Sequence, residues 1–233
     1  MLDKYNLTLE QNIFIAKRNL VDYIWKSANL EGIAVTYPET QDICNGMSIG
    51  GHTIEEINAV NDLKHAWMFM LENIDSKMDL ELIKQIHRVL GKFTVINAGS
   101  LRIQEVHIGG TDWIPPIPNE KETQDNITSI LADTTTATEK AINLMLYLMR
   151  SQLFYDGNKR IAMMAANKIM IYEGAGIISI PQKTKNDFLS LLVKFYETGD
   201  NSTIKQFVYN HCIDGIAFSK EDKIESRPES NIY

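Results

Sequence analysis

The run Phe154-Tyr155-Asp156-Gly157-Asn158-Lys159-Arg160 forms a polar loop between two apolar helical patterns. A helix that begins near Lys159, after a Gly-Asn turn, directs its free backbone N–H groups and the positive end of its dipole into this loop. Lys159 and Arg160 add positive charge at the same place, so the pattern indicates a phosphate site. Asp156 is suited to Mg²⁺, which takes one or two carboxylates and completes its shell with phosphate oxygens and water.

The alternative is an ordinary turn. Asp156 and Gly157 favour turns because of local hydrogen bonding and permitted backbone angles, and Lys159 and Arg160 are residue types that are usually solvated. On spacing alone this alternative is favoured, so the case for a site depends on the rest of the sequence.

Helical patterns surround the loop on both sides. A capping box at Thr8 to Gln11 opens an apolar pattern that predicts one helix over about residues 8–30, followed by a loop rich in Gly, Thr and Pro. A second capping box at Thr53 to Glu56 opens another helix, and Asp79 caps a third that Gly91 ends. Apolar spacing predicts further helices at 119–132, 138–152, 159–173, 184–198 and 202–213.

One stretch breaks this helical rhythm. Residues 98–118 alternate like a short strand, turn at Gly109-Gly110 and end in a proline cluster, which predicts a β-hairpin flap over residues 101–118. The predicted fold class is therefore all-α, a helical bundle with a small β-hairpin flap. The polar segment 216–233 is predicted to be a disordered tail.

The composition indicates an ordinary globular domain. The 233 residues are 44% apolar and 23% charged, and the net charge is −7, which opposes binding to nucleic acid or to an anionic membrane. The two cysteines form no CxxC pair, and neither an export signal nor an apolar span of membrane length is present. We expect a cytoplasmic protein.

The loop resembles the signature of the Fic family, His-x-Phe-x-Asp/Glu-Gly-Asn-Gly/Lys-Arg, which a second arginine usually follows two residues later. The matching positions are Phe154, Asp156, Gly157, Asn158 and Arg160. The runs Leu101 to Gly110 and Trp113 to Pro116 are similar to the family's flap, which docks a target segment as an added strand. The similarity extends over roughly residues 20–212.

The resemblance implies a nucleotide-binding relative of protein adenylyltransferases, which transfer AMP from ATP to a protein hydroxyl. It divides the chain into an N-terminal helical part at 1–40, a Fic-like core at 41–215 and the tail. The active-site loop would span 152–163, with ATP and Mg²⁺ as cofactors and an unidentified protein as target. The residues implied are Asp156, Asn158 and Arg160 for catalysis, Gly157, Asn158, Lys159 and Arg160 for phosphates, Asp156 for Mg²⁺, and His107, Ile108, Gly109 and Gly110 for target docking.

A third match lies near the N-terminus. Ser27-Ala28-Asn29-Leu30-Glu31-Gly32 is similar to the family's inhibitory motif, in which the glutamate obstructs placement of the γ-phosphate. Ser27 and Glu31 are four residues apart and share a helix face. The structural alternative for Glu31 is a helix-end residue before a glycine cap.

Two positions depart from the family pattern. Gln152 stands where the family has the histidine that acts as general base, and Met163 replaces the second arginine, which binds the γ-phosphate and pairs with the inhibitory glutamate. A glutamine amide accepts no proton at accessible pH, and positioned acid-base catalysis is worth roughly 10²–10⁴-fold. Glu31 would then turn to Arg160, find another donor or remain solvated. His107 is the one histidine considered as a substitute base, although a flap histidine is more often a surface residue.

Three functions remain open on the sequence. The first is an adenylyltransferase relative with weak or lost AMP transfer. The second is a pseudoenzyme that grips a partner strand through its flap. The third is a protein kinase of the Doc type, because Lys159 in place of the commoner glycine accompanies γ-phosphate transfer in that branch. The oligomeric state also stays open, a homo-oligomer included.

Overall fold

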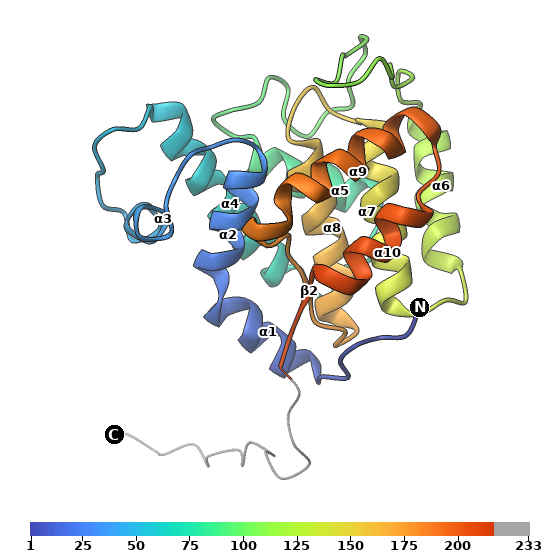
Figure 1. Cartoon of the computed structure of the whole chain (residues 1–233), viewed down its shortest axis with the longest axis horizontal. Coiled ribbons are helices and arrows are strands. Elements are labelled where there is room, and N and C mark those ends of the chain that lie inside the picture. The colour runs from blue at the N-terminus through green and yellow to red at the C-terminus, as the bar shows by residue number, and fades with distance from the viewer. Residues whose placement is uncertain (217–233) are drawn as a thin grey trace.

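The structure is a computed structural model that describes residues 1–216, so the tail predicted at 216–233 lies outside the described residues from position 217 onward. Its elements in chain order are α1 Leu9–Arg18, α2 Leu20–Leu30, α3 Tyr37–Cys44, α4 Ile54–Glu72, α5 Leu80–Leu90, α6 Glu120–Ala132, α7 Ala137–Ser151, α8 Asn158–Tyr172, β1 Ile177–Ile178, α9 Lys185–Thr198, α10 Ser202–His211 and β2 Ile213–Asp214, with a 3₁₀ turn at Gln182–Thr184 before α9. The predicted all-α class is confirmed (Figure 1).

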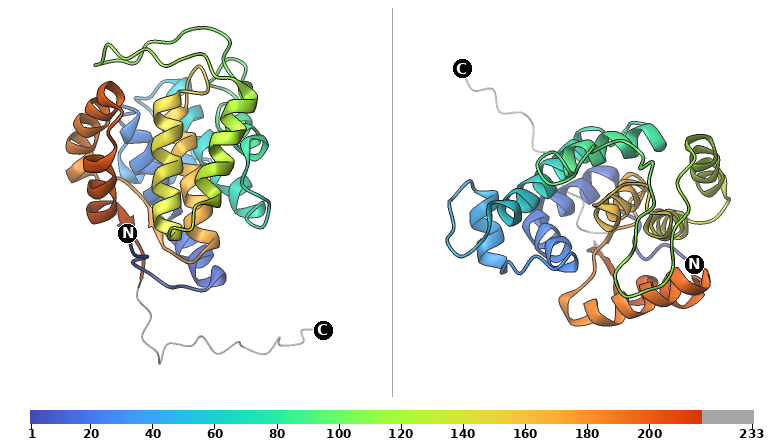
Figure 2. Two further views of the ribbon diagram at one scale, coloured as in Figure 1. Left: turned by 90° about the vertical axis from the view of Figure 1, so that its right-hand side faces the viewer. Right: turned by 90° about the horizontal axis from the view of Figure 1, so that it is seen from above.

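Helix α8 is the centre of the bundle. All of its residues are buried except Lys159 and Tyr172, and α1, α4, α5 and α7 pack around it (Figure 2). A buried polar side chain needs hydrogen-bond partners, and Asn167 finds them in β1, where its amide exchanges two bonds of 2.8 and 2.7 Å with the backbone of Ile178. The site loop therefore leads directly into the most buried element of the protein.

The prediction of one helix over residues 8–30 is wrong. The chain breaks at Asn19, which ends α1 and begins α2 with a non-helical φ of −103° and ψ of 15°. The break lets α1 pack against α8 while α2 packs against α3 and α4. A single straight helix could not make both sets of contacts.

The predicted β-hairpin at 101–118 is also corrected. The chain does turn at Gly109-Gly110, where Gly110 has a φ of +84°, but neither arm of this flap is a strand. Two features oppose a ladder: Pro115, Pro116 and Pro118 lack N–H donors, and the outgoing arm exposes its apolar side chains, with Ile103 79% exposed. Within residues 1–216 the one sheet pairs β1 with β2, with Ile177 opposite Asp214.

Helix α3 lies in the segment that the Gly, Thr and Pro content predicts to be a loop. Its start is a capping box in which the Thr36 hydroxyl accepts from the N–H of Glu39 and the Glu39 carboxylate accepts from the N–H of Thr36. Two other boxes, at Thr8 and Thr53, and the Asp79 cap form as predicted. Across residues 1–216, no helix combines the length and the apolar character that crossing a bilayer requires.

Candidate active site

The loop between α7 and α8 lies at the same end of the bundle as the flap (Figures 1 and 2). Two left-handed residues shape it: Gln152, with φ of +46° and ψ of 61°, ends α7, and Gly157, with φ of +77°, precedes α8. A Cβ on Gly157 would lie 3.2 Å from the Nε2 atom of His87, so glycine suits this position for both its backbone angle and its space.

Asn158 holds the loop together from inside. Its Oδ1 accepts from the N–H of Phe154 at 3.0 Å, and its Nδ2 donates to the Phe154 carbonyl at 2.7 Å and to the Gln152 Oε1 at 3.0 Å. The side chain is therefore fully engaged in shaping the loop. Only the backbone N–H of Asn158 remains for the phosphate-binding role that the resemblance implied.

His87, on α5, packs against the loop, and no local sequence pattern identifies it as a site residue. Its ring stacks on Phe154 at 3.7 Å between centroids, its Nδ1 accepts from the N–H of Gly99 at 2.9 Å, and its Nε2 lies 2.9 Å from the Asp156 carbonyl. Because Nδ1 is an acceptor, Nε2 carries the proton and the ring is neutral. Burial, with a smaller effect from Arg160, lowers the pKa of His87 to about 4.

Gln152, which the resemblance matches to the family's base, links α7 to the start of α8. Its Nε2 donates to the Met149 carbonyl at 2.6 Å while its Oε1 accepts from Asn158. One end of the amide is thus bound to the last turn of α7 and the other to the start of α8. The considered substitute, His107, has a 77% exposed side chain and pairs with Glu105 at 3.6 Å on the flap.

Glu31 contacts the two cations of the loop. Its Oε2 lies 2.8 Å from the Lys159 ammonium, and its Oε1 lies 3.9 Å from the Nε of Arg160. The structure therefore selects Lys159 as the main partner among the donors that the sequence left open. Arg160 is 5% exposed and also binds the Asp156 carboxylate at 2.9 Å, so one carboxylate flanks it on each side.

Met163 and Ser27 face a small cavity beside this cluster. Both side chains line it together with Arg160 and the α2 residues Tyr23 and Lys26. An apolar methionine thus stands near Arg160 where the family pattern has a second arginine. Among residues 1–216, Ser27 has no hydrogen bond to Glu31, so of these two residues of the predicted inhibitory motif Glu31 alone contacts the loop.

The start of α8 suits an anion and a divalent cation. Gly157 makes no side-chain cap hydrogen bond, so backbone N–H groups are left free at the start of the helix, and Lys159 and Arg160 follow at once. The Asp156 carboxylate is 63% exposed and uses one oxygen for Arg160. Within the described part of the chain no three His, Cys, Asp or Glu side chains gather into a metal cluster. This donor set fits Mg²⁺ that shares its shell with phosphate oxygens.

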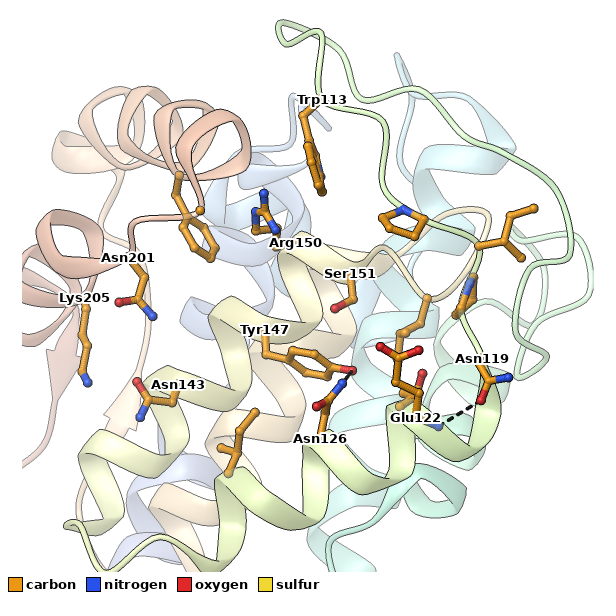
Figure 3. Close-up of a pocket in the computed structure, with 18 residues that line it drawn as sticks. Trp113, Asn119, Glu122, Asn126, Asn143, Tyr147, Arg150, Ser151, Asn201 and Lys205 are labelled. Atoms are coloured by element: carbon orange, nitrogen blue, oxygen red, sulfur yellow. Dashed lines mark hydrogen bonds between the residues drawn. The ribbon is translucent and has the colours of Figure 1, made fainter.

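A larger groove lies beside the loop (Figure 3). It measures about 620 Å³ and runs between the returning arm of the flap, α6, α7 and the turn between α9 and α10. Its cations are engaged: Arg150 stacks on Trp113 at 3.9 Å and donates to the Tyr196 carbonyl, and Lys205 binds Glu139 at 2.6 Å. The cations of the groove, like Lys159 and Arg160 at the start of α8, are thus already paired with other groups of the protein.

Comparisons with known proteins bear on this arrangement. Residues 77–170, which include the loop, match the Fic/DOC family. "Protein adenylyltransferase fic-1" of Caenorhabditis elegans is 28% identical over 199 residues, which cover 81% of this chain and 39% of that protein. "Protein adenylyltransferase Fic" of Drosophila yakuba is 25% identical over 201 residues, which cover 82% of this chain and 40% of that protein. The chain thus spans about two fifths of the length of these relatives.

Among solved structures, Fic-1 (residues 134–508) of Caenorhabditis elegans superposes with a TM-score of 0.73 at 24% identity, over 84% of this chain and 62% of that one. At this identity the likeness shows the fold. Together with the family match over the loop, it confirms the resemblance seen in the sequence: residues 77–170 match the Fic/DOC family domain, and the fold is that of the Fic-1 structure.

Proposed function

We propose that this protein binds Mg²⁺-ATP at the start of α8 and is a relative of protein adenylyltransferases whose AMP transfer is weak or lost. The observation that carries the proposal is that the Gln152 side chain, at the position of the family's base, is held by hydrogen bonds at both ends of its amide. The loop around it keeps the shape and the cations of an anion site, while both ends of the Gln152 amide are bound to Met149 and Asn158. No proton acceptor stands where the family places its base.

Each retained residue has a task in this site. The backbone N–H groups at the start of α8 and the side chains of Lys159 and Arg160 would hold phosphate oxygens. Asp156 would hold Mg²⁺, which neutralises phosphate charge when bound. A base at position 152 would take the proton of a target hydroxyl as its oxygen bonds to the α-phosphorus and pyrophosphate leaves. Glutamine cannot perform that step.

Glu31 is proposed to inhibit nucleotide binding through a different partner from the family's. Its carboxylate contacts Lys159 and lies near Arg160, so it would compete with a phosphate for these cations. Binding of ATP would require Glu31 to leave these cations. Met163 supplies no charge to hold it, so the strength of inhibition depends on Lys159.

The second candidate is a pseudoenzyme that binds a partner protein through its flap. It is favoured by the same engagement of Gln152, because a side chain fixed by two hydrogen bonds stabilises the loop without serving chemistry. A kinase of the Doc type has less support, since it also requires a base. Whichever of these functions the protein has, we place it in the cytosol, in keeping with its two buried cysteines, which form no disulfide.

The test is mass spectrometry after incubation with ATP and Mg²⁺, on wild type, Gln152→His, Glu31→Gly and the double variant. AMP attached to the double variant and absent from wild type supports an intact site silenced at Gln152. Phosphate in place of AMP would indicate the kinase. Adding Arg160→Ala to the double variant is the matched control, because it keeps the new base and removes the phosphate ligand.

Titration calorimetry with Mg²⁺-ATP gives a readout that needs no target. Binding without any adduct would favour the pseudoenzyme. The nucleotide-binding proposal is wrong if neither wild type nor Glu31→Gly binds.

A further inference from the structure

Arg102 is a fully buried cation at the base of the flap. Its side chain is 0% exposed, and among the described residues it forms no salt bridge. An isolated buried charge is strongly unfavourable unless hydrogen bonds satisfy it. The position of this guanidinium must therefore be explained by its hydrogen bonds.

Backbone carbonyls supply all of these hydrogen bonds. The Nε donates to Gln152 at 2.6 Å, the Nη1 donates to Gln104 at 2.7 Å, and the Nη2 donates to Pro115 at 3.0 Å and to Pro116 at 2.5 Å. The backbone N–H of Arg102 also donates to the Leu153 carbonyl at 3.0 Å.

These acceptors come from three separate parts of the chain. Gln104 lies on the outgoing arm of the flap, Pro115 and Pro116 lie on its returning arm, and Gln152 opens the site loop. The flap lacks a strand ladder, so one side chain provides the bonds that close its base. Gln152 in turn binds Asn158 at the start of α8, which connects the flap to the proposed anion site through Arg102 and Gln152.

We propose that Arg102 is a positioning residue that fixes the flap relative to the active-site loop. The planar guanidinium presents its donors in a rigid fork and reaches all three segments at once. A lysine ammonium in the same place is a compact point charge on a flexible stem and would reach only part of the set. That this loop is an active-site loop rests on the proposed function, whereas the hydrogen bonds of Arg102 to the flap do not depend on it.

The test measures the position of the flap directly. Spin labels are placed at Asp112→Cys on the flap and Lys17→Cys on α1, at the opposite end of the bundle (Figure 1), both exposed, with Cys44 and Cys212 changed to serine. Pulsed electron resonance then gives the distribution of distances between the labels. Arg102→Met is expected to broaden and shift this distribution relative to the labelled parent, and Arg102→Lys to do so less.

Lys168→Met is the matched control. Lys168 is likewise a buried cation that binds a backbone carbonyl, that of Ser76, away from the flap. It is expected to lower the free energy of unfolding while leaving the distance distribution as in the parent. A purely structural role for Arg102 would make the two variants alike.

An unchanged distribution in Arg102→Met, or an equal change in Lys168→Met, would overturn the proposal. If Arg102→Met does not fold, Arg102→Lys decides, because an unchanged distribution there also counts against the proposal. Absence of ATP binding by both the wild type and Glu31→Gly would contradict the proposed function and leave this measurement valid. The two failures are therefore distinguishable.

Discussion

The Glu31 carboxylate lies 2.8 Å from the Lys159 ammonium, so the end of α2 and the start of α8 are joined across the proposed nucleotide site. Replacing Glu31 by glycine is expected to tighten Mg²⁺-ATP binding about tenfold, equal to about 1.4 kcal/mol, because phosphate no longer competes with a carboxylate. Titration calorimetry measures the change. Asp22→Ala is the control, since it removes an α2 carboxylate that pairs with Lys26. Equal affinities for wild type and Glu31→Gly would contradict the inhibitory role.

Arg160→Ala is expected to weaken Mg²⁺-ATP binding by roughly 10- to 100-fold, because charge-assisted hydrogen bonds contribute about 1.5–3 kcal/mol. The comparison is best made in the Glu31→Gly background, where no carboxylate from α2 competes. Lys121→Ala, an exposed cation on α6, controls for the loss of one positive charge. Undiminished affinity in Arg160→Ala would move the phosphate site away from α8.

Asn158→Ala is expected to lower the free energy of unfolding by about 2–3 kcal/mol, because it leaves the Phe154 N–H and two acceptors in the loop without partners. Urea denaturation measures this loss. Asn126→Ala, an exposed amide bound to Tyr147 at 3.3 Å, should change the stability by less than about 0.5 kcal/mol. Similar values for the two variants would mean that Asn158 does not organise the loop.

The lowered pKa of His87 predicts that the protein loses stability in acid. Its pKa is about 4 in the fold against an ordinary value of 6.5, so between these values the unfolded chain binds a proton that the folded protein excludes. The contribution of neutral His87 to the free energy of unfolding is complete above pH 6.5. It decreases as the pH falls through 4, by a total of about 3 kcal/mol.

His87→Gln tests this dependence, because glutamine can keep the bonds to Gly99 and Asp156 without titrating. The difference in unfolding free energy between wild type and variant, followed by urea denaturation from pH 7 to pH 4, should shrink toward acid. Carboxylates elsewhere titrate equally in both proteins and cancel. A difference that stays constant with pH would show that His87 does not keep its low pKa.

The sequence predicted the helices best where a side chain caps the backbone locally. Thr8, Thr53 and Asp79 each satisfy N–H groups within three residues, so the signal and the structure lie in the same short segment. The break at Asn19 could not be predicted in this way, because it depends on which helices α1 and α2 pack against. The prediction of a hairpin was wrong because alternation of side chains is compatible with a strand but does not supply the neighbouring strand to which its backbone must hydrogen-bond.

The loop residues were identified by their pattern, but their tasks depend on contacts across long sequence distances. The side chain of Asn158 hydrogen-bonds to the backbone of Phe154, and Lys159 pairs with Glu31, which lies 128 positions earlier in the chain at the end of α2. His87 and Arg102 carried no local signal. A histidine in an amphipathic helix and an arginine in an exposed-looking arm become informative only when the loop is folded over them.

The left-handed backbone at Gln152 has an evolutionary consequence. Few side chains tolerate a φ of +46°, and histidine is among those enriched there, whereas β-branched residues are strongly disfavoured. The genetic code separates glutamine from histidine codons by the third base alone. The protein therefore stands a single point mutation from acquiring an imidazole at this position, on a main chain already shaped to accept it.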